Sequence, residues 1–312
     1  MKVDIISGFL GAGKTSFIIK LLKEAFKNEK IVIIENEYGE IGIDGTLLKE
    51  YTMNIKELYS GCICCSVVGD FVTALDEIMN DYKPDRIIVE PSGVAKLSDI
   101  KRACEQSKYW RDMELNMIVT MLDATKYNIH IKNFGEFFND QIKCGKTIVL
   151  TRIEQLSLEE KDHLIKEIQE KNSNANIISK PLEEINGEEI IEVGEKPAVK
   201  TDVIRKVENH QHHHEHHHHH TAEDVFEKWE TLTHKAYEED EIKNILMALD
   251  KKIAGNVLRG KGIVKHKVSG WLQFSYVHNE HHITPIKEQK QGQVYIVGHG
   301  LKEEQLKTFF AS

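Results

Sequence analysis

The 312-residue sequence is poor in the features that mark secreted, membrane-bound or nucleic-acid-binding chains. It has five cysteines, too few for a disulfide framework in a chain of this length. No apolar run approaches the ~20 residues of a membrane-spanning helix, and no secretory signal precedes the first apolar segment. The formal net charge of −9 gives no electrostatic support for binding nucleic acid. These absences predict a cytoplasmic protein that binds neither membrane nor nucleic acid.

A phosphate-binding loop is the first feature that is present. Residues Ser7–Thr15 fit the pattern Gly, four residues, Gly-Lys-Thr, between a predicted strand at Lys2–Ile6 and a predicted helix at Ser16–Lys27. Glycines let backbone N–H groups turn toward a phosphate, and the start of the helix adds positive potential. Lys14 is predicted to bridge the outer phosphates, and the Thr15 hydroxyl to hold Mg²⁺. The nucleotide-binding residues predicted here are Gly8, Gly11, Ala12, Gly13, Lys14, Thr15 and Ser16.

Two apolar strands run into acidic residues. One leads into the segment Glu35–Asp44, and the strand Pro84–Glu90 ends in a carboxylate. In an open parallel sheet, ligands lie beyond the carboxyl ends of the strands. Glu90 is therefore predicted to complete the Mg²⁺ shell as a Walker B acid, and the Gly93 backbone to sense a γ-phosphate. The carboxylates of the acidic segment, which includes Glu37, could serve Mg²⁺, the attacking water or a second metal. A solvated loop without a ligand is the alternative.

Three cysteines lie within four residues, at Cys62, Cys64 and Cys65. Thiolates favour soft or borderline ions such as Zn²⁺ or Cu⁺ over Mg²⁺. Three sulfurs do not complete a tetrahedron, so the fourth ligand is left open between Glu37, a histidine and water. Buried inert thiols and a redox pair are the alternatives. The other two cysteines are isolated and are predicted to lie in the core.

The strand Lys146–Leu150 ends where many GTPases carry the guanine-reading sequence Asn-Lys-x-Asp. Glu154 can accept hydrogen bonds from the guanine ring as the usual Asp does, and the stem of Arg152 can cover the base. Because the sequence departs from the usual one, ATP stays an alternative to GTP, and an ordinary strand-to-helix loop is the alternative structure. The residues predicted to contact the base are Thr151, Arg152 and Glu154.

Nine of the 17 histidines fall between His210 and His220. Such a tract cannot bury a core and is predicted to be a disordered linker. Its imidazoles are mostly neutral at pH 7 and free to bind Zn²⁺, Ni²⁺ or Co²⁺, as a metal store or a delivery arm. An expression tag is the alternative. The metal ligands predicted here are His212, His213, His214, His216, His217 and His218.

Alternating strands and helices predict an α/β P-loop NTPase domain over residues 1–190, with a mostly parallel sheet and helices on both faces. The chain is expected to become loop-like from about Glu183, with an acidic and histidine-rich linker over 191–221. A smaller α+β domain is predicted over 222–312. Helix-like stretches are expected within Ala222–Tyr237 and Glu239–Lys252, and a terminal helix at Glu303–Phe310. Strands are expected at Gly262–Val268, Gly270–Val277 and Gln293–Val297.

Together these motifs resemble the CobW-type family of metallochaperone GTPases, which is related to the nickel-insertion GTPases of urease and hydrogenase. The matching segments, spread over nearly the whole chain, are Gly8–Thr15, Asn36–Asp44, Gly61–Ser66, Glu90–Gly93, Leu258–Gly262, Trp271 and Gly298–Gly300. The resemblance implies GTP hydrolysis coupled to the handling of zinc, cobalt or nickel. It also implies metal binding at Cys62, Cys64 and Cys65, and Mg²⁺ or switch roles for Glu37 and Glu90.

The sequence as a whole therefore predicts a GTP-hydrolysing metallochaperone. It would use GTP and Mg²⁺, carry Zn²⁺ foremost, with Co²⁺ or Ni²⁺ as other candidates, and deliver the metal to a client metalloprotein. The predicted catalytic residues are Lys14, Glu37 and Glu90. Hydrolysis is expected to be slow without a partner, because no arginine finger or glutamine is evident near the switch. A nucleotide- or metal-dependent dimer is also considered, and the alternative functions are a metal-storage protein with incidental GTPase activity and a P-loop small-molecule kinase.

Overall fold

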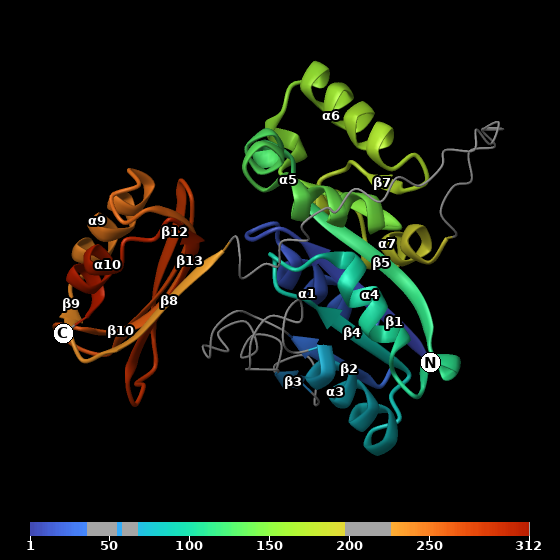
Figure 1. The fold of residues 1–312 in the computed structure, drawn as a ribbon, viewed down its shortest axis with the longest axis horizontal. Coiled ribbons are helices and arrows are strands. Elements are labelled where there is room, and N and C mark those ends of the chain that lie inside the picture. The colour runs from blue at the N-terminus through green and yellow to red at the C-terminus, as the bar shows by residue number, and fades with distance from the viewer. Residues whose placement is uncertain (36–54, 58–67, 197–225, 312) are drawn as a thin grey trace, which may run out of the picture.

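The computed structural model describes residues 1–35, 55–57, 68–196 and 226–311. Two sheets organise these residues, a larger one in the amino-terminal part and a smaller one in the carboxyl-terminal part (Figure 1). Among the described helices, none has both the length and the apolar character that crossing a bilayer demands.

Seven strands of the described residues form the large sheet, and all of its pairings are parallel. The order β3-β2-β4-β1-β5-β6-β7 places β1 in the middle, so the loop that follows β1 opens at the centre of one sheet edge. The strands are β1 (Lys2–Gly8), β2 (Ile31–Glu35), β3 (Ile55–Glu57), β4 (Arg86–Glu90), β5 (Glu114–Asp123), β6 (Thr147–Thr151) and β7 (Asn176–Ile178). The predicted mostly parallel sheet is confirmed.

Helices cover both faces of this sheet, as predicted. Side chains alternate along each strand, so Val3 and Ile5 of β1 join the core under α3 and α4, whereas Ile6 joins the core under α1. Helix α7 packs beside α1, and α5 and α6 continue the layer begun by α3 and α4. The helices are α1 (Lys14–Glu24), α3 (Val68–Asp81), α4 (Leu97–Glu105), α5 (Tyr127–Cys144), α6 (Leu158–Lys171) and α7 (Gly187–Glu195).

A closed polar cluster joins the elements at the amino edge of the large sheet, where the amino ends of its parallel strands lie. Arg86 of β4 is 2% exposed, and its Nη1 donates to the buried carboxylate of Asp4 on β1. Its Nε donates to Glu29 at 2.6 Å, and its Nη2 to Glu195 of α7 at 3.2 Å. The guanidinium also lies over the Phe26 ring, 4.2 Å from the ring centroid. Partners from within the fold therefore surround this buried charge.

The second sheet is antiparallel along the order β12-β11-β10-β13-β8, and β9 pairs in parallel with the end of β10. Helices α9 and α10 pack on one of its faces and share an apolar core with it. The predicted smaller α+β unit is thus confirmed. Its elements are β8 (Glu227–Thr233), β9 (Ala236–Tyr237), α9 (Glu239–Asp250), β10 (Asn256–His266), β11 (Trp271–Val277), β12 (Glu280–Ile286), β13 (Gly292–His299) and α10 (Glu303–Phe310).

Alternation along β10 separates its glycines from its charged residues. A Cβ atom added at Gly262 would collide with the Phe274 ring, and one added at Gly260 would lie 2.9 Å from Ile296 Cδ1. Both glycines therefore face the core beneath α9 and α10, where aromatic rings lie against the strand. Arg259 and Lys261, which alternate with these glycines along the strand, consequently face the opposite side of the sheet.

The structure contradicts the helix predicted for one segment of the described residues. The segment expected to contain helix-like stretches between Ala222 and Tyr237 forms strands β8 and β9. Its Glu, Lys and Leu residues suit a helix locally, but Trp229 and Thr233 are buried and β8 pairs along its length with β13. Pairing and burial override local helix propensity here.

A helix also forms where a loop was expected. Helix α7 lies in the acidic stretch after Glu183 and begins with a capping box between Asn186 and Glu189. It packs on α1 and β5 and brings Glu195 to the Arg86 cluster.

Helix α5 is kinked at Phe134, whose φ of −135° is non-helical. Strand β10 begins before the expected Gly262, while α4 and β12 were not predicted. The described residues also form short 3-10 turns at Trp110–Asp112, Ala124–Lys126, Ile153–Gln155 and Leu182–Glu184.

Candidate nucleotide site

The loop after β1 has the backbone geometry of a phosphate cradle. Gly8 and Gly13 have φ values of 138° and 91°, in the region where a Cβ atom is strained, and Gly13 caps the start of α1. Lys14 is only 5% exposed. Its Nζ donates to the Gly8 carbonyl at 3.0 Å and lies 3.5 Å from the Phe9 carbonyl. The lysine is therefore folded back over the loop, with its charge at the mouth of the cradle.

The structure brings the predicted magnesium residues together. The Thr15 hydroxyl on α1 lies 3.1 Å and 3.3 Å from the two carboxylate oxygens of Glu90, at the end of β4. Glu35 of β2 is in register with Glu90 and is buried as well. A hydroxyl beside a carboxylate at the end of a phosphate loop is the donor set that holds Mg²⁺ in P-loop proteins. The residues present thus fit a magnesium ion, although the individual roles stay predictions.

The segment after β4 lies against the phosphate loop. A Cβ atom added at Gly93 would lie 2.7 Å from the Leu10 backbone nitrogen, so only glycine allows this approach. Gln141 of α5 donates to the Gly93 carbonyl at 3.2 Å and holds the segment from behind. This placement is compatible with the predicted γ-phosphate sensor, which remains a prediction.

The end of β6 also reaches the loop. The Thr151 hydroxyl donates to the Ala12 carbonyl at 3.2 Å. Arg152 has a left-handed φ of 56°, and its Nη1 donates to Asp123 at 2.6 Å and to the Gly11 carbonyl at 3.3 Å. Glu154 is exposed on the 3-10 turn that follows. Thr151 and Arg152 therefore border the cradle, while base recognition by this segment stays a prediction.

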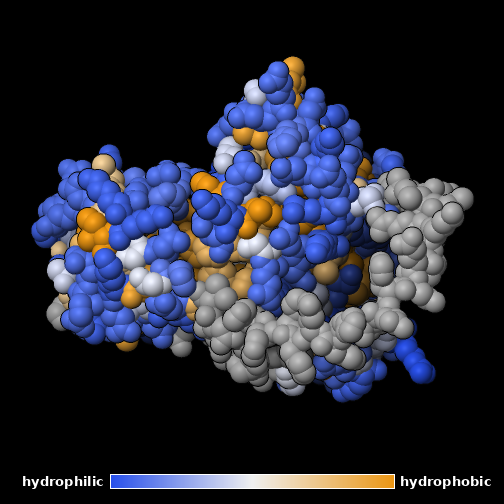
Figure 2. Space-filling model, turned by 45° about the horizontal axis from the view of Figure 1, so that its top comes forward, coloured by the Kyte–Doolittle hydropathy of each residue, from blue (hydrophilic) through white to orange (hydrophobic). Residues whose placement is uncertain are grey.

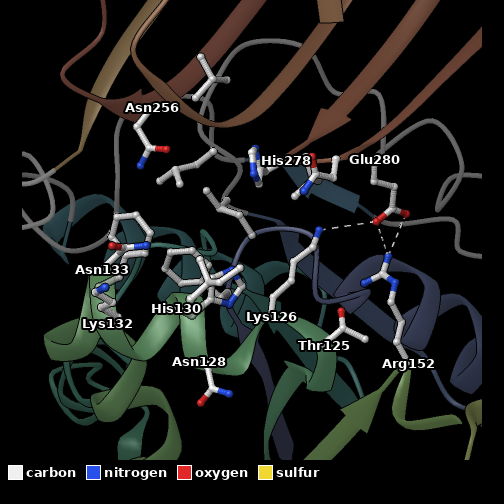
Figure 3. A pocket seen from close by; sticks show the side chains of 18 of the residues that line it. Thr125, Lys126, Asn128, His130, Lys132, Asn133, Arg152, Asn256, His278 and Glu280 are labelled. Atoms are coloured by element: carbon white, nitrogen blue, oxygen red, sulfur yellow. Dashed lines mark hydrogen bonds and ion pairs between the residues drawn. The ribbon is translucent and has the colours of Figure 1, made fainter. Parts of the chain in front are cut away.

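Arg152 also connects the two sheets. Its Nη2 donates to both carboxylate oxygens of Glu280 on β12, at 2.9 Å each, and Lys126 Nζ lies 3.7 Å from the same carboxylate. Figure 3 shows Glu280 above these two cations, which reach it from the first domain. One carboxylate of the second domain is thus held beside the phosphate loop.

One face of the second sheet points at the phosphate loop. A Cβ atom added at Gly11 would lie 2.9 Å from Val277 Cγ2 on β11. Val277 is in register with Arg259 on β10, and Ser275 is in register with Lys261. A cavity of about 250 Å³ lies between this face and the loop. Its charged and histidine lining residues are Lys14, Glu90, Arg152, Arg259, Lys261, Glu280 and His282.

Arg259 and Lys261 are the residues that the sequence reasoning missed. They stand in the segment Leu258–Gly262, which was noted only for its resemblance to a family motif. The alternation of glycine with a cation was an available signal, since it predicts a strand with one charged and one closely packed face. The sequence showed no arginine finger near the switch, and Arg259 of the second domain lines this cavity.

A larger cavity of about 950 Å³ adjoins the other side of the loop. Figure 3 shows it between α5 and the strands of the second sheet, with His130 and Lys132 on one wall and Asn256 and His278 on the other. His130 is 6% exposed, and its ring packs against the Phe9 ring at a tilt of 44°, with centroids 4.5 Å apart. Burial lowers the pKa of His130 from 6.5 to about 4, so the ring is neutral near pH 7.

Aromatic contacts continue from this wall into the second domain. Phe226, just before β8, packs on Phe134 and Phe137 with centroids 5.4 Å and 5.1 Å away. Tyr295 and Val297 of β13 belong to the same apolar cluster. Figure 2 shows hydrophobic residues gathered where the two lobes meet, on a surface that is otherwise mostly hydrophilic. The phosphate loop and the second sheet are therefore held by one continuous apolar contact.

Several predicted site residues lie outside the described residues. They are Glu37, Cys62, Cys64, Cys65, His212, His213, His214, His216, His217 and His218. Across the parts of the chain that the structure describes, no three Cys, His, Asp or Glu side chains gather in a metal-binding group. Cys104 is buried, as predicted, and burial raises its pKa to about 12, while Cys144 is partly buried.

The central parallel sheet, the glycine-rich cradle and the Thr15–Glu90 pair define a P-loop nucleotide-binding protein. Residues 2–179 match the family model described as CobW/HypB/UreG, nucleotide-binding domain. The chain belongs to this family, and the predicted resemblance is confirmed.

The chain is similar to curated proteins of this kind. It is 29% identical over 186 residues to the zinc chaperone YeiR of Escherichia coli, covering 60% of this chain and 57% of that protein. It is 31% identical over 176 residues to the zinc chaperone CobW of Sinorhizobium sp, covering 47% and 49%. The crystal structure of Zn(II)-bound YjiA GTPase from E. coli aligns over 100% of this chain and 98% of that chain, at 18% identity and a TM-score of 0.47. The chain thus spans about half the length of these curated relatives.

Proposed function

We propose that this protein is a GTP-hydrolysing metallochaperone. It binds a transition metal, zinc foremost, through Cys62, Cys64 and Cys65 and passes it to a client metalloprotein under nucleotide control. The proposal has two parts, a nucleotide site at the centre of the large sheet and a metal site made by the three cysteines.

The Thr15–Glu90 pair is the observation that carries the nucleotide part. A hydroxyl from α1 and a carboxylate from β4 meet within 3.1 Å at the mouth of the cradle, where Lys14 also lies. These two side chains would hold Mg²⁺, and the bound ion would neutralise charge on the phosphate oxygens. Lys14 would bind the outer phosphates, Gly93 would contact the γ-phosphate, and Arg152 and Glu154 would border the base. Glu37 is proposed to assist hydrolysis or to hold a metal.

The metal part rests on the chemistry of clustered thiols and on family membership. Three cysteines within four residues favour a borderline ion such as Zn²⁺. Two similar proteins are named zinc chaperones, which makes zinc the first candidate ahead of Co²⁺ and Ni²⁺. The histidines between His210 and His220 are proposed as additional ligands. A reducing compartment such as the cytoplasm would keep the thiols available, and a nucleotide- or metal-dependent dimer belongs to the same proposal.

The histidine tract supports a second candidate, a metal-storage protein whose GTPase activity is incidental. Nine imidazoles between His210 and His220 can bind several ions regardless of the nucleotide. The two functions differ in one respect. A store binds metal equally in all nucleotide states, whereas a nucleotide-controlled carrier does not.

Phosphate release from GTP and from ATP, with and without Zn²⁺, tests the proposal. We expect hydrolysis of GTP in preference to ATP, and a change in rate when Zn²⁺ is added. Lys14→Ala should abolish hydrolysis, because the charge at the cradle is removed. Replacing all three clustered cysteines by serine should leave basal hydrolysis and remove the response to Zn²⁺.

Three other results would contradict the proposal in different ways. Equal turnover of ATP would remove the GTP preference. A rate that ignores Zn²⁺ in the unmodified protein would favour the storage function. Transfer of phosphate to a small acceptor, unchanged in the triple serine variant, would identify a kinase.

A further inference from the structure

We infer that the second domain completes the phosphate site: Arg259 and Lys261 of β10 bind the outer phosphates of the nucleotide that the P-loop holds. This inference rests on the proposed nucleotide site and adds residues from the other domain to it. Neither the loop motif nor the Walker B strand includes them.

Two cavities place these cations opposite the cradle. The cavity of about 250 Å³ has Gly13, Lys14 and Thr15 on one wall and Arg259 and Lys261 on the other. A second, of about 20 Å³, is bounded by Lys14, Glu90 and Gly93 and again by Arg259 and Lys261. Phosphates held in the cradle would therefore face β10 across the larger cavity.

The packing of β10 decides the face of the sheet on which Arg259 and Lys261 lie. Gly260 and Gly262 pack against Ile296 and Phe274, so β10 cannot rotate to turn its cations away without placing glycines on the wrong face. On the same face, Tyr295 belongs to the apolar cluster that also contains Phe9 and Leu10 of the phosphate loop. The contact that joins the domains thus also sets the cations over the cradle.

Charge explains what such an arrangement can bind. Lys261 is 5% exposed, and a lysine buried to this degree is stable only near anionic or polar partners. With Lys14 and Arg152, the cavity wall carries four cationic side chains against the carboxylates of Glu90 and Glu280. A nucleoside triphosphate carries more negative charge than a diphosphate. Binding of the triphosphate should therefore gain more from Arg259 and Lys261 than binding of the diphosphate.

The cations also have a role in hydrolysis. A water oxygen forms a bond to the γ-phosphorus, and the bond from that phosphorus to the β,γ-bridging oxygen breaks. The diphosphate leaves with the electron pair, and the proton from water passes to the released phosphate or the solvent. Negative charge grows on the bridging and β oxygens, where a guanidinium donates hydrogen bonds most effectively. Arg259 is therefore assigned to stabilising the negative charge of the transition state, and Lys261 is assigned to binding the γ-phosphate.

Single-turnover GTP hydrolysis and the affinities for a non-hydrolysable GTP analogue and for GDP test this assignment on the full chain. For Arg259→Ala, we expect the hydrolysis rate to fall by about 100-fold or more. For Lys261→Met, we expect weaker binding of the analogue with GDP affinity little changed. Lys265→Ala is the matched control, because Lys265 lies farther along the same strand and is exposed to solvent. It should behave as the unmodified protein.

The outcomes separate this inference from the proposed function. If the unmodified protein hydrolyses GTP and Lys14→Ala does not, while Arg259→Ala keeps the full rate and both affinities, the inference is wrong and the proposed function stands. If the unmodified protein neither binds nor hydrolyses GTP, both are wrong. Arg259→Lys guards against a folding defect, since it keeps the charge. It should restore the melting temperature and the analogue affinity but only part of the hydrolysis rate.

Discussion

The two edges of the large sheet carry similar charged side chains in different settings. At the amino edge, Arg86 is enclosed by Asp4, Glu29 and Glu195, and every partner comes from within the fold. At the carboxyl edge, Lys14 and Glu90 border a cavity. The same chemical groups thus fill an interior at one edge and line an opening at the other.

This difference teaches how to separate structural charge from functional charge. A buried ion with complete internal partners serves the folded state, and removing it leaves another charge uncompensated. Charges that line a cavity are instead placed where a ligand can meet them. Substitutions at the amino edge should therefore change stability, and those at the carboxyl edge should change nucleotide binding.

The largest expected effect is at the amino edge. Arg86→Met leaves the carboxylate of Asp4 buried without its cation, so the free energy of unfolding should fall by about 3–5 kcal/mol. Urea unfolding measures this change. Arg102→Ala is the control, since its ion pair with Asp99 is on the surface, and it should cost at most ~0.5 kcal/mol. A loss for Arg86→Met no greater than that of the control would contradict a structural role.

At the carboxyl edge, Lys14→Ala should weaken binding of GTP by roughly 100-fold, because removing a charged donor from a phosphate site has an effect of this order. Stability should change little, since the Lys14 Nζ donates to the Gly8 carbonyl and lies 3.5 Å from the Phe9 carbonyl, both within the loop itself. Fluorescence titration with a labelled GTP analogue measures the affinity. Lys20→Ala, on the same helix but in a surface pair with Glu24, should bind as before. Equal affinities for the two variants would place the nucleotide elsewhere.

His130 extends the comparison to pH. Its pKa is lowered from 6.5 to about 4 by burial, so between these values the unfolded chain binds a proton that the folded chain does not. The pKa shift therefore leaves the free energy of unfolding unchanged above about pH 6.5 and lowers it progressively as the pH falls toward 4. His130→Phe should flatten the decline by up to ~1.4 kcal/mol per pH unit. Unfolding curves from pH 7 to pH 5 measure it, and the exposed His163→Gln is the control. Parallel declines for His130→Phe and the unmodified protein would refute the prediction.

The smallest effect is expected where the domains meet. Arg152 donates two hydrogen bonds to Glu280 across the contact, but both side chains are partly exposed. A double-mutant cycle of Arg152→Ala and Glu280→Ala should give a coupling of about 1 kcal/mol in urea unfolding. The exposed pair Lys307 and Glu304 serves as reference, with a coupling near zero. Identical couplings for the two pairs would mean that Arg152 and Glu280 do not join the domains.

The sequence predicts the elements around the phosphate loop well, because its signals are local. The cradle and its helix are continuous in the chain, and Glu90 ends an apolar strand whose neighbour must be β1 in a P-loop sheet. Short-range patterns decide these elements, so the strand, loop and helix were found together with Lys14 and Thr15.

Long-range packing decides the rest. Strand β8 reads as a helix by composition and becomes a strand only because β13 pairs with it. Arg259 and Lys261 face the cradle because Tyr295 shares an apolar cluster with Phe9 and Leu10 of the phosphate loop, and this packing joins residues far apart in the sequence. The three clustered cysteines lie outside the described residues, and their role stays a prediction.

Zinc affinity in different nucleotide states tests the central claim most directly. The protein would be prepared with every histidine from His210 to His220 replaced by serine, so that the thiols dominate binding. It would then be titrated with Zn²⁺ against a chromophoric chelator, in the presence of a non-hydrolysable GTP analogue, GDP or no nucleotide. A nucleotide-controlled carrier predicts affinities that differ by roughly 5- to 150-fold between the states. Equal affinities in all three would contradict it and leave a nucleotide site and a metal site that act independently.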